Sequence, residues 1–255
     1  RRALAPYDFL QQGELAGSAH MQHANVYGLD IETDTSTDGL DPTVAPVLTI
    51  ALSGRKLDEV FVGPEAELIV ALDARLADLE PGVLATWNGS TFDLPFIADR
   101  ARILGLDLGL QLCLDRGLTM NRAPLPGHAG AYRAAWHHHT HIDTFRLYGH
   151  ESPSGHWTSL RAIGRVLGLG PAARRDAGRR PQVLANEALH AHAPSDARLA
   201  RVLAERRWAA AARLIDKVAP VEAEIVSVAA ERLARQARVS GRTVMGSGEP
   251  VTASV

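Results

Sequence analysis

The sequence predicts an α/β protein built around a mixed β-sheet. The chain has 255 residues, of which 46% are hydrophobic and 22% are charged. These values are typical of a globular protein with a sizeable core. Short apolar segments alternate with amphipathic ones in the first half of the chain, and helical periodicity dominates after residue 157. This order of elements is that of a sheet covered by helices.

The predicted elements run in the order three strands, a helix, a strand, a helix, a strand and then several helices. They are strands 25–33, 45–54 and 58–63, helix 65–80, strand 82–89, helix 93–106, a strand at the end of 131–145, and helices from 158–170 to about residue 230. A loop rich in Gly, Pro and Arg is expected over 115–130 and a basic loop over 171–181. We therefore expect a flexible N-terminal arm over 1–24, one folded domain over 25–235 and a flexible C-terminal tail over 236–255.

Charge, cysteine content and hydropathy exclude some classes of protein. The net charge of -2 excludes a histone-like nucleic-acid binder, but it does not exclude an enzyme that binds nucleic acid through a local part of its surface. Cys113 is the only cysteine, which favours a reducing compartment. No apolar run approaches the roughly 18 residues of a membrane span, and Arg1 and Arg2 are not followed by a signal-peptide segment. We expect a cytoplasmic protein with no membrane partner.

Acidic residues stand where two predicted strands end. Asp30 and Glu32 are two residues apart, so both point to the same face of their strand. Adjacent carboxylates repel each other, and a divalent cation with oxygen ligands, Mg²⁺ or Mn²⁺, would compensate for that repulsion. The alternative is a strand that runs out into solvent. Asp93 stands at the entry of the next helix, where it could also complement the helix dipole.

These segments together resemble a known family. "DIET" at 30–33, "NGSTFDLPF" at 88–96 and an acid in a late helix resemble the DEDD superfamily of 3′–5′ exonucleases. The resemblance runs from about Val26 to Trp208 and is closest to the proofreading exonuclease domain of family B DNA polymerases and its stand-alone relatives. It implies that 25–235 forms an exonuclease domain with an RNase H-like mixed sheet flanked by helices. It also implies two metal ions, Mg²⁺ or Mn²⁺, held by Asp30, Glu32, Asp93 and Asp196.

The resemblance assigns roles to individual positions. In the family the acid matching Asp30 bridges both ions, those matching Glu32 and Asp196 help hold the ion that activates water, and the one matching Asp93 binds the other ion. Two cations about 4 Å apart can stabilise the attacking and leaving oxygens of a phosphodiester. Asn88 and Phe92 match positions along the path of the terminal nucleotides, and Thr33 is expected to contact the 3′ end.

Two histidines precede the last acid. One branch of the superfamily has Tyr four residues before this acid, and the other has His five residues before it. Here His192 stands four residues before Asp196 and His190 stands six before it. The sequence therefore has a histidine in the tyrosine position, and in the family the residue at this position orients or deprotonates the attacking water. The resemblance favours His192 as the catalytic base, with His190 or neither histidine as the alternatives, and neutral imidazole is a competent base near pH 7. Pro194 leaves two possibilities open: a kinked helix, or a helix that begins at Pro194 after a loop.

Three further features carry weaker signals. "HHHTHID" at 137–143 places His137, His139 and His141 on one strand face, and we interpret it as a solvated strand edge rather than a metal chelate. Asp143 ends this strand and could be a fifth acid near the site, although the resemblance implies a role that is more structural than catalytic. Four arginines at 174, 175, 179 and 180 could bind phosphates or form a solvated loop.

The sequence predicts a metal-dependent 3′–5′ exonuclease that acts on nucleic acid, with single-stranded DNA as the expected substrate. One alternative is a catalytically impaired nucleic-acid-binding module of the same fold, because the motif tyrosine is absent. Another is an RNA-trimming exoribonuclease with the same acidic site. The expected cofactors are two Mg²⁺ or Mn²⁺ ions.

Overall fold

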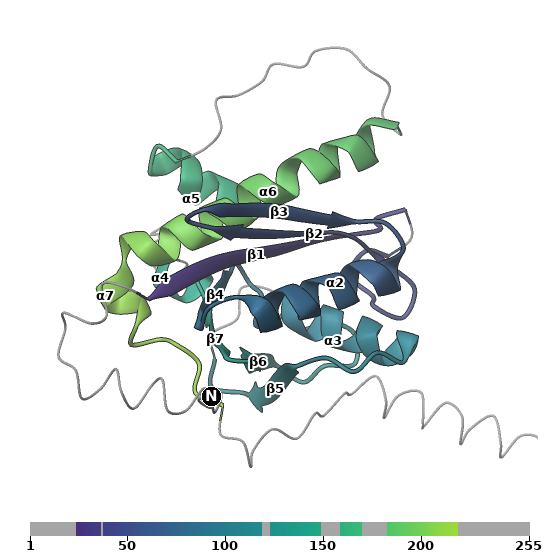
Figure 1. Ribbon diagram of the computed structural model, residues 1–255, viewed down its shortest axis with the longest axis horizontal. Helices are drawn as coiled ribbons and strands as arrows, with labels where there is room; N and C mark the ends of the chain where they lie inside the picture. Colours follow the sequence, from purple (N-terminus) through teal and green to yellow (C-terminus); the bar gives the residue numbers. More distant parts are fainter. Residues whose placement is uncertain (1–23, 37, 119–122, 149–158, 170–182, 219–255) are drawn as a thin grey trace, which may run out of the picture.

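The computed structural model describes residues 24–36, 38–118, 123–148, 159–169 and 183–218, with 183–192 described only as part of a helix. Figure 1 shows the arrangement of these residues. The predicted arm and tail and the basic loop at 171–181 lie outside the described residues, apart from Ala24, so they stay predictions. Among the described residues, no helix has the length and apolar composition that crossing a membrane requires.

A mixed sheet of seven strands forms the centre of the described structure. Its order is β3-β2-β1-β4-β7-β6-β5. β1 pairs in parallel with β4, and β4 with β7, whereas the other neighbours are antiparallel. The strands are β1 (Asn25–Thr33), β2 (Val47–Gly54), β3 (Leu57–Val62), β4 (Gly82–Thr86), β5 (Leu110–Asp115), β6 (Ala131–Trp136) and β7 (His139–Asp143). The carboxyl ends of the three parallel strands therefore meet at one edge of the sheet.

Helices cover both faces of this sheet. In Figure 1, α6 (Val183–Arg206) and α5 (Leu160–Val166) lie on one side of β1 and β2, and α2 (Glu65–Asp78) and α3 (Asp93–Leu104) lie on the other. Two short helices, α4 (Phe145–Tyr148) and α7 (Trp208–Ala211), complete the described elements. The predicted α/β fold, an RNase H-like mixed sheet flanked by helices, is confirmed.

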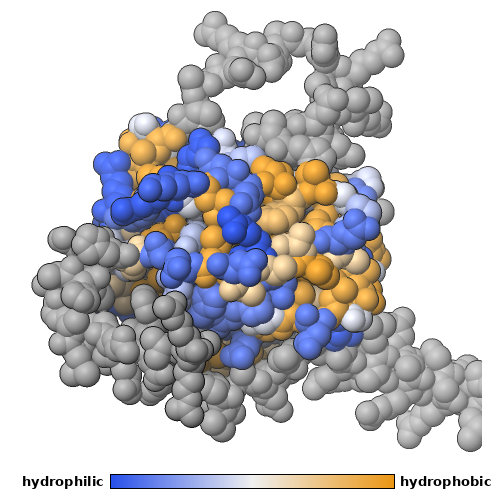
Figure 2. Space-filling view, in the orientation of Figure 1, coloured by the Kyte–Doolittle hydropathy of each residue, from blue (hydrophilic) through white to orange (hydrophobic). Residues whose placement is uncertain are grey.

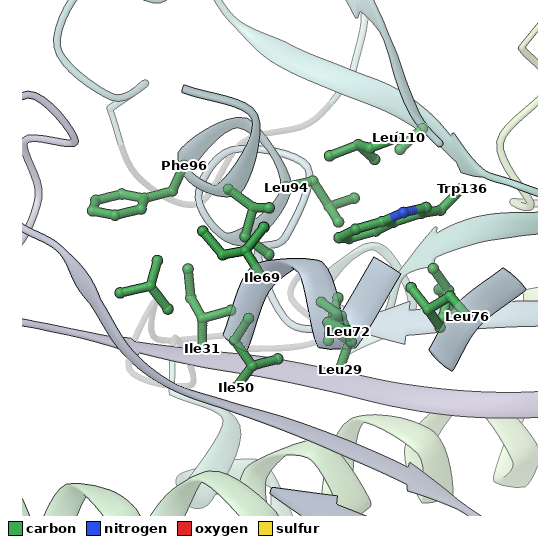
Figure 3. Packing of buried hydrophobic residues seen from close by; sticks show 14 of the residues in the cluster. Leu29, Ile31, Ile50, Ile69, Leu72, Leu76, Leu94, Phe96, Leu110 and Trp136 are labelled. Carbon is green, nitrogen blue, oxygen red and sulfur yellow. The ribbon is translucent and has the colours of Figure 1, made fainter. Parts of the chain in front are cut away.

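The larger hydrophobic core lies between the sheet and the α2–α3 layer. Leu29 and Ile31 of β1 pack with Ile69 and Leu72 of α2 in a cluster that extends to Trp136 (Figure 3). A second cluster, which includes Ile142 and Leu203, joins the other face to α5, α6 and α7. The two clusters together bury both faces of the central strands, as parallel pairing requires. The outer surface seen in Figure 2 carries hydrophobic areas beside hydrophilic ones.

Two parts of the sheet differ from the prediction. The sequence indicated no strand at β5, and it indicated one strand where β6 and β7 form a hairpin. The hairpin turns at His137, which has a φ of 50°, and at His138. No Gly, Pro or Asn marks this turn, so the usual signals of a hairpin are missing from the sequence.

Candidate active site

Alternation along β1 separates its apolar and acidic side chains. Leu29 and Ile31 belong to the core below the sheet, on the side of α2. The intervening residues Gly28, Asp30 and Glu32 lie on the opposite face, which α6 covers. The prediction that both carboxylates share one face is confirmed.

Helix α6 approaches β1 closely because small residues line the contact. A Cβ built on Gly28 would lie 1.8 Å from the carbonyl oxygen of Ala197, so no larger residue fits there. Ala51, Ala193 and Ala197 form a cluster of small buried side chains at the same contact. Asp196 is thereby brought to the two acids of β1, and one carboxylate oxygen of each of the three lies within 4.8 Å of the others.

Asp93 reaches the site from the other layer. The β1–β4 ladder ends at the pair Gly28–Ala85, and the chain then turns at Asn88, whose φ is 64°. Asn tolerates this left-handed conformation better than most residues. The turn leads into α3, which begins at Asp93, and the backbone N–H of Ile31 donates to Asp93 Oδ1 at 3.2 Å. Beyond the point where β4 stops pairing with β1, the start of α3 therefore lies beside β1.

Asp143 holds this turn in place. Its carboxylate accepts hydrogen bonds from the backbone N–H groups of Asn88 at 2.8 Å, Ser90 at 3.3 Å and Phe145 at 3.0 Å. Its side chain is buried, and burial raises its pKa while the neighbouring His141 and these hydrogen bonds lower it. The structural role that the sequence predicted for Asp143 agrees with these contacts.

The four predicted acids line one cavity of about 600 Å³, which we call the acidic pocket. Its described lining is completed by Ile31, Trp87, Phe92, Ser159, Leu160 and Arg161. Carboxylate oxygens grouped in this way suit Mg²⁺ or Mn²⁺, so the donor set fits the predicted ions. Phe92 lies in the pocket wall as the sequence predicted, but Trp87 and Arg161 were not identified from the sequence.

Two predicted substrate-binding residues lie outside the described lining of the pocket. Thr33 is buried, and its hydroxyl donates to the carbonyl of Gly39 at 2.7 Å. Asn88 is also buried, at the turn before α3. Their roles toward substrate stay predictions.

The carboxylates of the pocket disfavour one another's charge. Burial raises the pKa of Asp30 well above its ordinary value, and the nearby Asp93, Asp196 and Glu32 raise it further. Burial, followed by repulsion from Asp196, raises the pKa of Glu32 to about 7. Arg161 opposes both shifts. The site therefore favours added positive charge, which a divalent cation supplies.

Pro194 does not end the helix that carries Asp196. α6 runs from Val183 to Arg206 with Pro194 inside it. Of the two possibilities left open by the sequence, the one in which the helix begins at Pro194 is wrong. His190 and His192 both lie within α6, and the position of His192 is one turn before Asp196. The side chains of both histidines lie outside the described part of the structure.

The histidines of the 137–143 cluster are buried or half-buried rather than solvated, so the predicted strand edge is wrong. His139 and His141 are fully buried in β7. His138 Nε2 and His139 Nε2 bond the carbonyls of Leu79 and Leu76, at 2.5 and 2.8 Å, at the end of α2. His141 bonds Thr86 and Asp216 instead. The histidines thus hydrogen-bond to different polar groups of neighbouring elements. The alternation of side chains along one strand does not reveal such partners, because they come from distant parts of the sequence.

Comparisons with known proteins agree with this geometry. Residues 55–163 match the family described as "DNA polymerase family B, exonuclease domain". That range includes Asn88, Phe92 and Asp93 but neither Asp30 nor Asp196. The chain is 29% identical over 89 residues to DNA polymerase 2 of Aeropyrum pernix, a match that covers 33% of this chain and 11% of that protein.

A solved structure gives the same fold. The family B DNA polymerase of Pyrobaculum calidifontis matches with a TM-score of 0.53 and 21% sequence identity, over 72% of this chain and 24% of the polymerase chain. The chain thus spans a small part of both polymerases. The predicted resemblance to the exonuclease domain of family B DNA polymerases is confirmed by these matches.

Proposed function

We propose that this protein is a metal-dependent 3′–5′ exonuclease that hydrolyses the terminal phosphodiester of a nucleic-acid strand, with single-stranded DNA as its substrate. The observation that carries the proposal is the convergence of Asp30, Glu32, Asp93 and Asp196 on one cavity from three elements. The similarity to polymerase exonuclease domains supports the polarity of the reaction and the choice of DNA.

In this proposal the four acids hold two Mg²⁺ or Mn²⁺ ions. Bound ions would supply an activated water and stabilise charge on the phosphodiester oxygens. Asp30, Glu32 and Asp196 offer oxygens close to one another, and Asp93 is held beside them by its bond to Ile31. His192, one turn before Asp196, would accept the proton of the attacking water.

The pocket walls suit a single nucleotide. A cavity of about 600 Å³ is within the usual range for a small-molecule site and has room for one terminal residue of a strand. Trp87 and Phe92 present aromatic surface in its lining, and base–aromatic stacking accepts any base. Sequence-independent removal of terminal nucleotides is the expected consequence, with Thr33 proposed to contact the 3′ end and Asn88 proposed to lie along the path of the terminal nucleotides.

Two observations favour a second function, a nucleic-acid-binding module without cleavage. Arg161 pairs with Asp196, and the tyrosine position of the family holds His192. Both features would lower activity while leaving a basic side chain available to a phosphate. An RNA-trimming exoribonuclease would use the same four acids and differ in its tolerance of the 2′-hydroxyl.

The test is cleavage of 5′-labelled DNA and RNA oligonucleotides with Mg²⁺, Mn²⁺ or EDTA. We expect stepwise shortening of single-stranded DNA from its 3′ end with either ion and none with EDTA. Asp93→Asn should abolish shortening, whereas the matched control Asp107→Asn, an exposed carboxylate outside the acidic pocket, should not. Endonucleolytic products, or equal cleavage in EDTA, would contradict the proposal. Binding without cleavage would favour the second function, and faster shortening of RNA would favour the third.

A further inference from the structure

Arg161 makes the most extensive ion pair of the acidic pocket. The side chain extends from the second residue of α5 to Asp196 in α6. Its Nε lies 3.2 Å from Oδ1 and 2.9 Å from Oδ2 of Asp196, and its Nη2 lies 2.7 Å from Oδ2. Both oxygens of this carboxylate thus lie within hydrogen-bond distance of one guanidinium, with the two shorter contacts on Oδ2.

The position of this pair makes it more than a surface contact. Arg161 is the basic residue among the described residues that line the pocket, where it faces four carboxylates. The side chain of Asp196 is 14% exposed, whereas that of Arg161 is 47% exposed. The guanidinium can therefore leave Asp196 and enter solvent without burying its charge. Asp196 has no such freedom, because α6 is packed tightly on Gly28.

A divalent cation and the guanidinium compete for the same carboxylate. A bound ion would take an oxygen of Asp196 at roughly 2.0–2.6 Å, where Oδ2 now accepts two N–H groups. A metal ion at that distance would also lie close to a guanidinium of the same sign of charge. An ion held by Oδ2 would therefore have to displace the two N–H groups that this oxygen accepts.

We propose that Arg161 is the internal counter-ion of the acidic pocket, which holds Asp196 when the metal is absent and is displaced when the metal binds. This inference rests on the proposed metal site. It makes Arg161 a positioning residue with two opposite effects. Arg161 stabilises the metal-free protein by relieving carboxylate repulsion, and it weakens metal binding because its ion pair must first be broken.

Arg161→Met tests both effects, since it keeps much of the length of the side chain and removes its charge. With the full chain, we expect Mn²⁺ to bind on the order of tenfold more tightly by isothermal titration calorimetry. In EDTA, the thermal midpoint of this variant should be lower than that of the unmodified protein. Arg161→Lys keeps the charge but loses the planar fork of N–H donors. Its Mn²⁺ affinity and its thermal midpoint in EDTA should therefore lie between those of Arg161→Met and those of the unmodified protein.

A matched control is available on the same helix. Arg165 is exposed, its Nε bonds the backbone carbonyl of Arg161, and it does not belong to the described pocket lining. Arg165→Met should leave Mn²⁺ affinity unchanged. If Arg161→Met binds Mn²⁺ no more tightly than the unmodified protein, or less tightly, the counter-ion proposal is wrong.

A measurement on the unmodified protein does not depend on any variant's folding. The NMR signal of the Arg161 Nε–H group, assigned by its loss in Arg161→Lys, should move toward that of a solvated arginine as Mg²⁺ is added. A signal that stays unchanged at saturating Mg²⁺ would overturn the proposal. Mn²⁺ binding with the expected competition but without nuclease activity would contradict the proposed function alone, whereas tight Mn²⁺ binding that ignores Arg161 would contradict only the counter-ion role.

Discussion

Two groups of acids in this protein, one buried and one mostly half-buried, have opposite surroundings. The carboxylate of Asp216 accepts hydrogen bonds from His141 Nδ1 at 2.6 Å, Arg146 Nη1 at 3.0 Å and the backbone N–H of Ala134 at 3.2 Å. Asp143 is similarly surrounded by three backbone N–H groups. The carboxylates of the acidic pocket instead face one another, and Arg161 is the described cation that opposes them.

The difference separates acids that hold the fold together from acids available for chemistry. Donors fix Asp143 and Asp216, so a metal ion would have to displace them. In the acidic pocket, repulsion raises the pKa of Asp30 and Glu32, and an added cation would relieve it. Both groups consist of carboxylates, but the donors to Asp143 and Asp216 belong to buried or largely buried parts of the fold, whereas Asp196 is held by one exposed guanidinium.

The largest expected effect is on cleavage. Asp30→Asn should lower the rate of 3′ shortening on the order of 10³–10⁵-fold, because Asp30 is the proposed shared ligand of both ions. Its stability in EDTA should hold or rise, since one repelling carboxylate is removed. Gel-based cleavage and thermal melting measure the two quantities. Near-native activity in this variant would show that the site is assigned wrongly.

The next effect concerns the two histidines of α6. His192→Ala should slow cleavage by about 10²–10⁴, the usual scale for a general base. His190→Ala should lose little, because six residues before Asp196 is a different side of a continuous helix. His192→Tyr restores the family's residue and should keep substantial activity. A greater loss in His190→Ala than in His192→Ala would assign the base to His190.

Asp216→Asn is the counterpart of Asp30→Asn in the other group of acids. The change leaves His141 and Arg146 without their buried anion, so the free energy of unfolding should fall by about 3 kcal/mol. Cleavage per folded molecule should stay unchanged, because Asp216 lies outside the described lining of the acidic pocket. Urea unfolding and active-site titration measure these quantities. A selective loss of activity without loss of stability would contradict the structural role assigned to Asp216.

Gly28→Ala tests whether close packing of α6 sets the pocket. The added Cβ would lie 1.8 Å from the Ala197 carbonyl oxygen, so α6 must move and carry Asp196 with it. We expect a stability loss of about 1–3 kcal/mol and a rate loss on the order of 10²-fold. Gly130→Ala is the control, since its Cβ would meet Leu114 at an ordinary 3.4 Å. Equal effects of the two variants would refute this role of Gly28.

Much of the fold follows from local pattern. The strand predicted over 25–33 and the helices predicted over 65–80 and 93–106 correspond to β1, α2 and α3 because their apolar residues repeat at clear periods. β5 was missed because a short edge strand has little alternation to detect. The helix through Pro194 was left open because packing against β1 and β2, not propensity, decides whether a helix tolerates an internal proline.

The residues of the site likewise fall into those that the sequence predicts and those that only the fold reveals. Asp30, Glu32 and Asp93 could be identified because they stand next to strand and helix boundaries, and Asp196 because its position matches the family's last motif. Arg161 could not be identified, because its bond to Asp196 joins residues 35 positions apart. The buried roles of His139 and His141 were missed for the same reason, since their partners come from α2, β4 and the segment after α7.

The central claim is that repulsion among the pocket's acids is relieved by a divalent cation, and the sign of a pH effect tests it most directly. The pKa of Glu32 is raised from 4.5 to about 7 by folding. The metal-free protein should therefore lose stability as pH rises from about 4.5 through 7, because the folded form retains a proton that the unfolded form has released.

Mn²⁺ binds the ionised form, so its stabilisation should grow over the same interval. The measurement is the shift in thermal midpoint on adding Mn²⁺ at pH 5 and at pH 7.5, for the unmodified protein and for Glu32→Gln. We predict a larger shift at pH 7.5 in the unmodified protein and a smaller, less pH-dependent shift in Glu32→Gln. A shift that is absent, or equal at both pH values and in both proteins, would contradict the account.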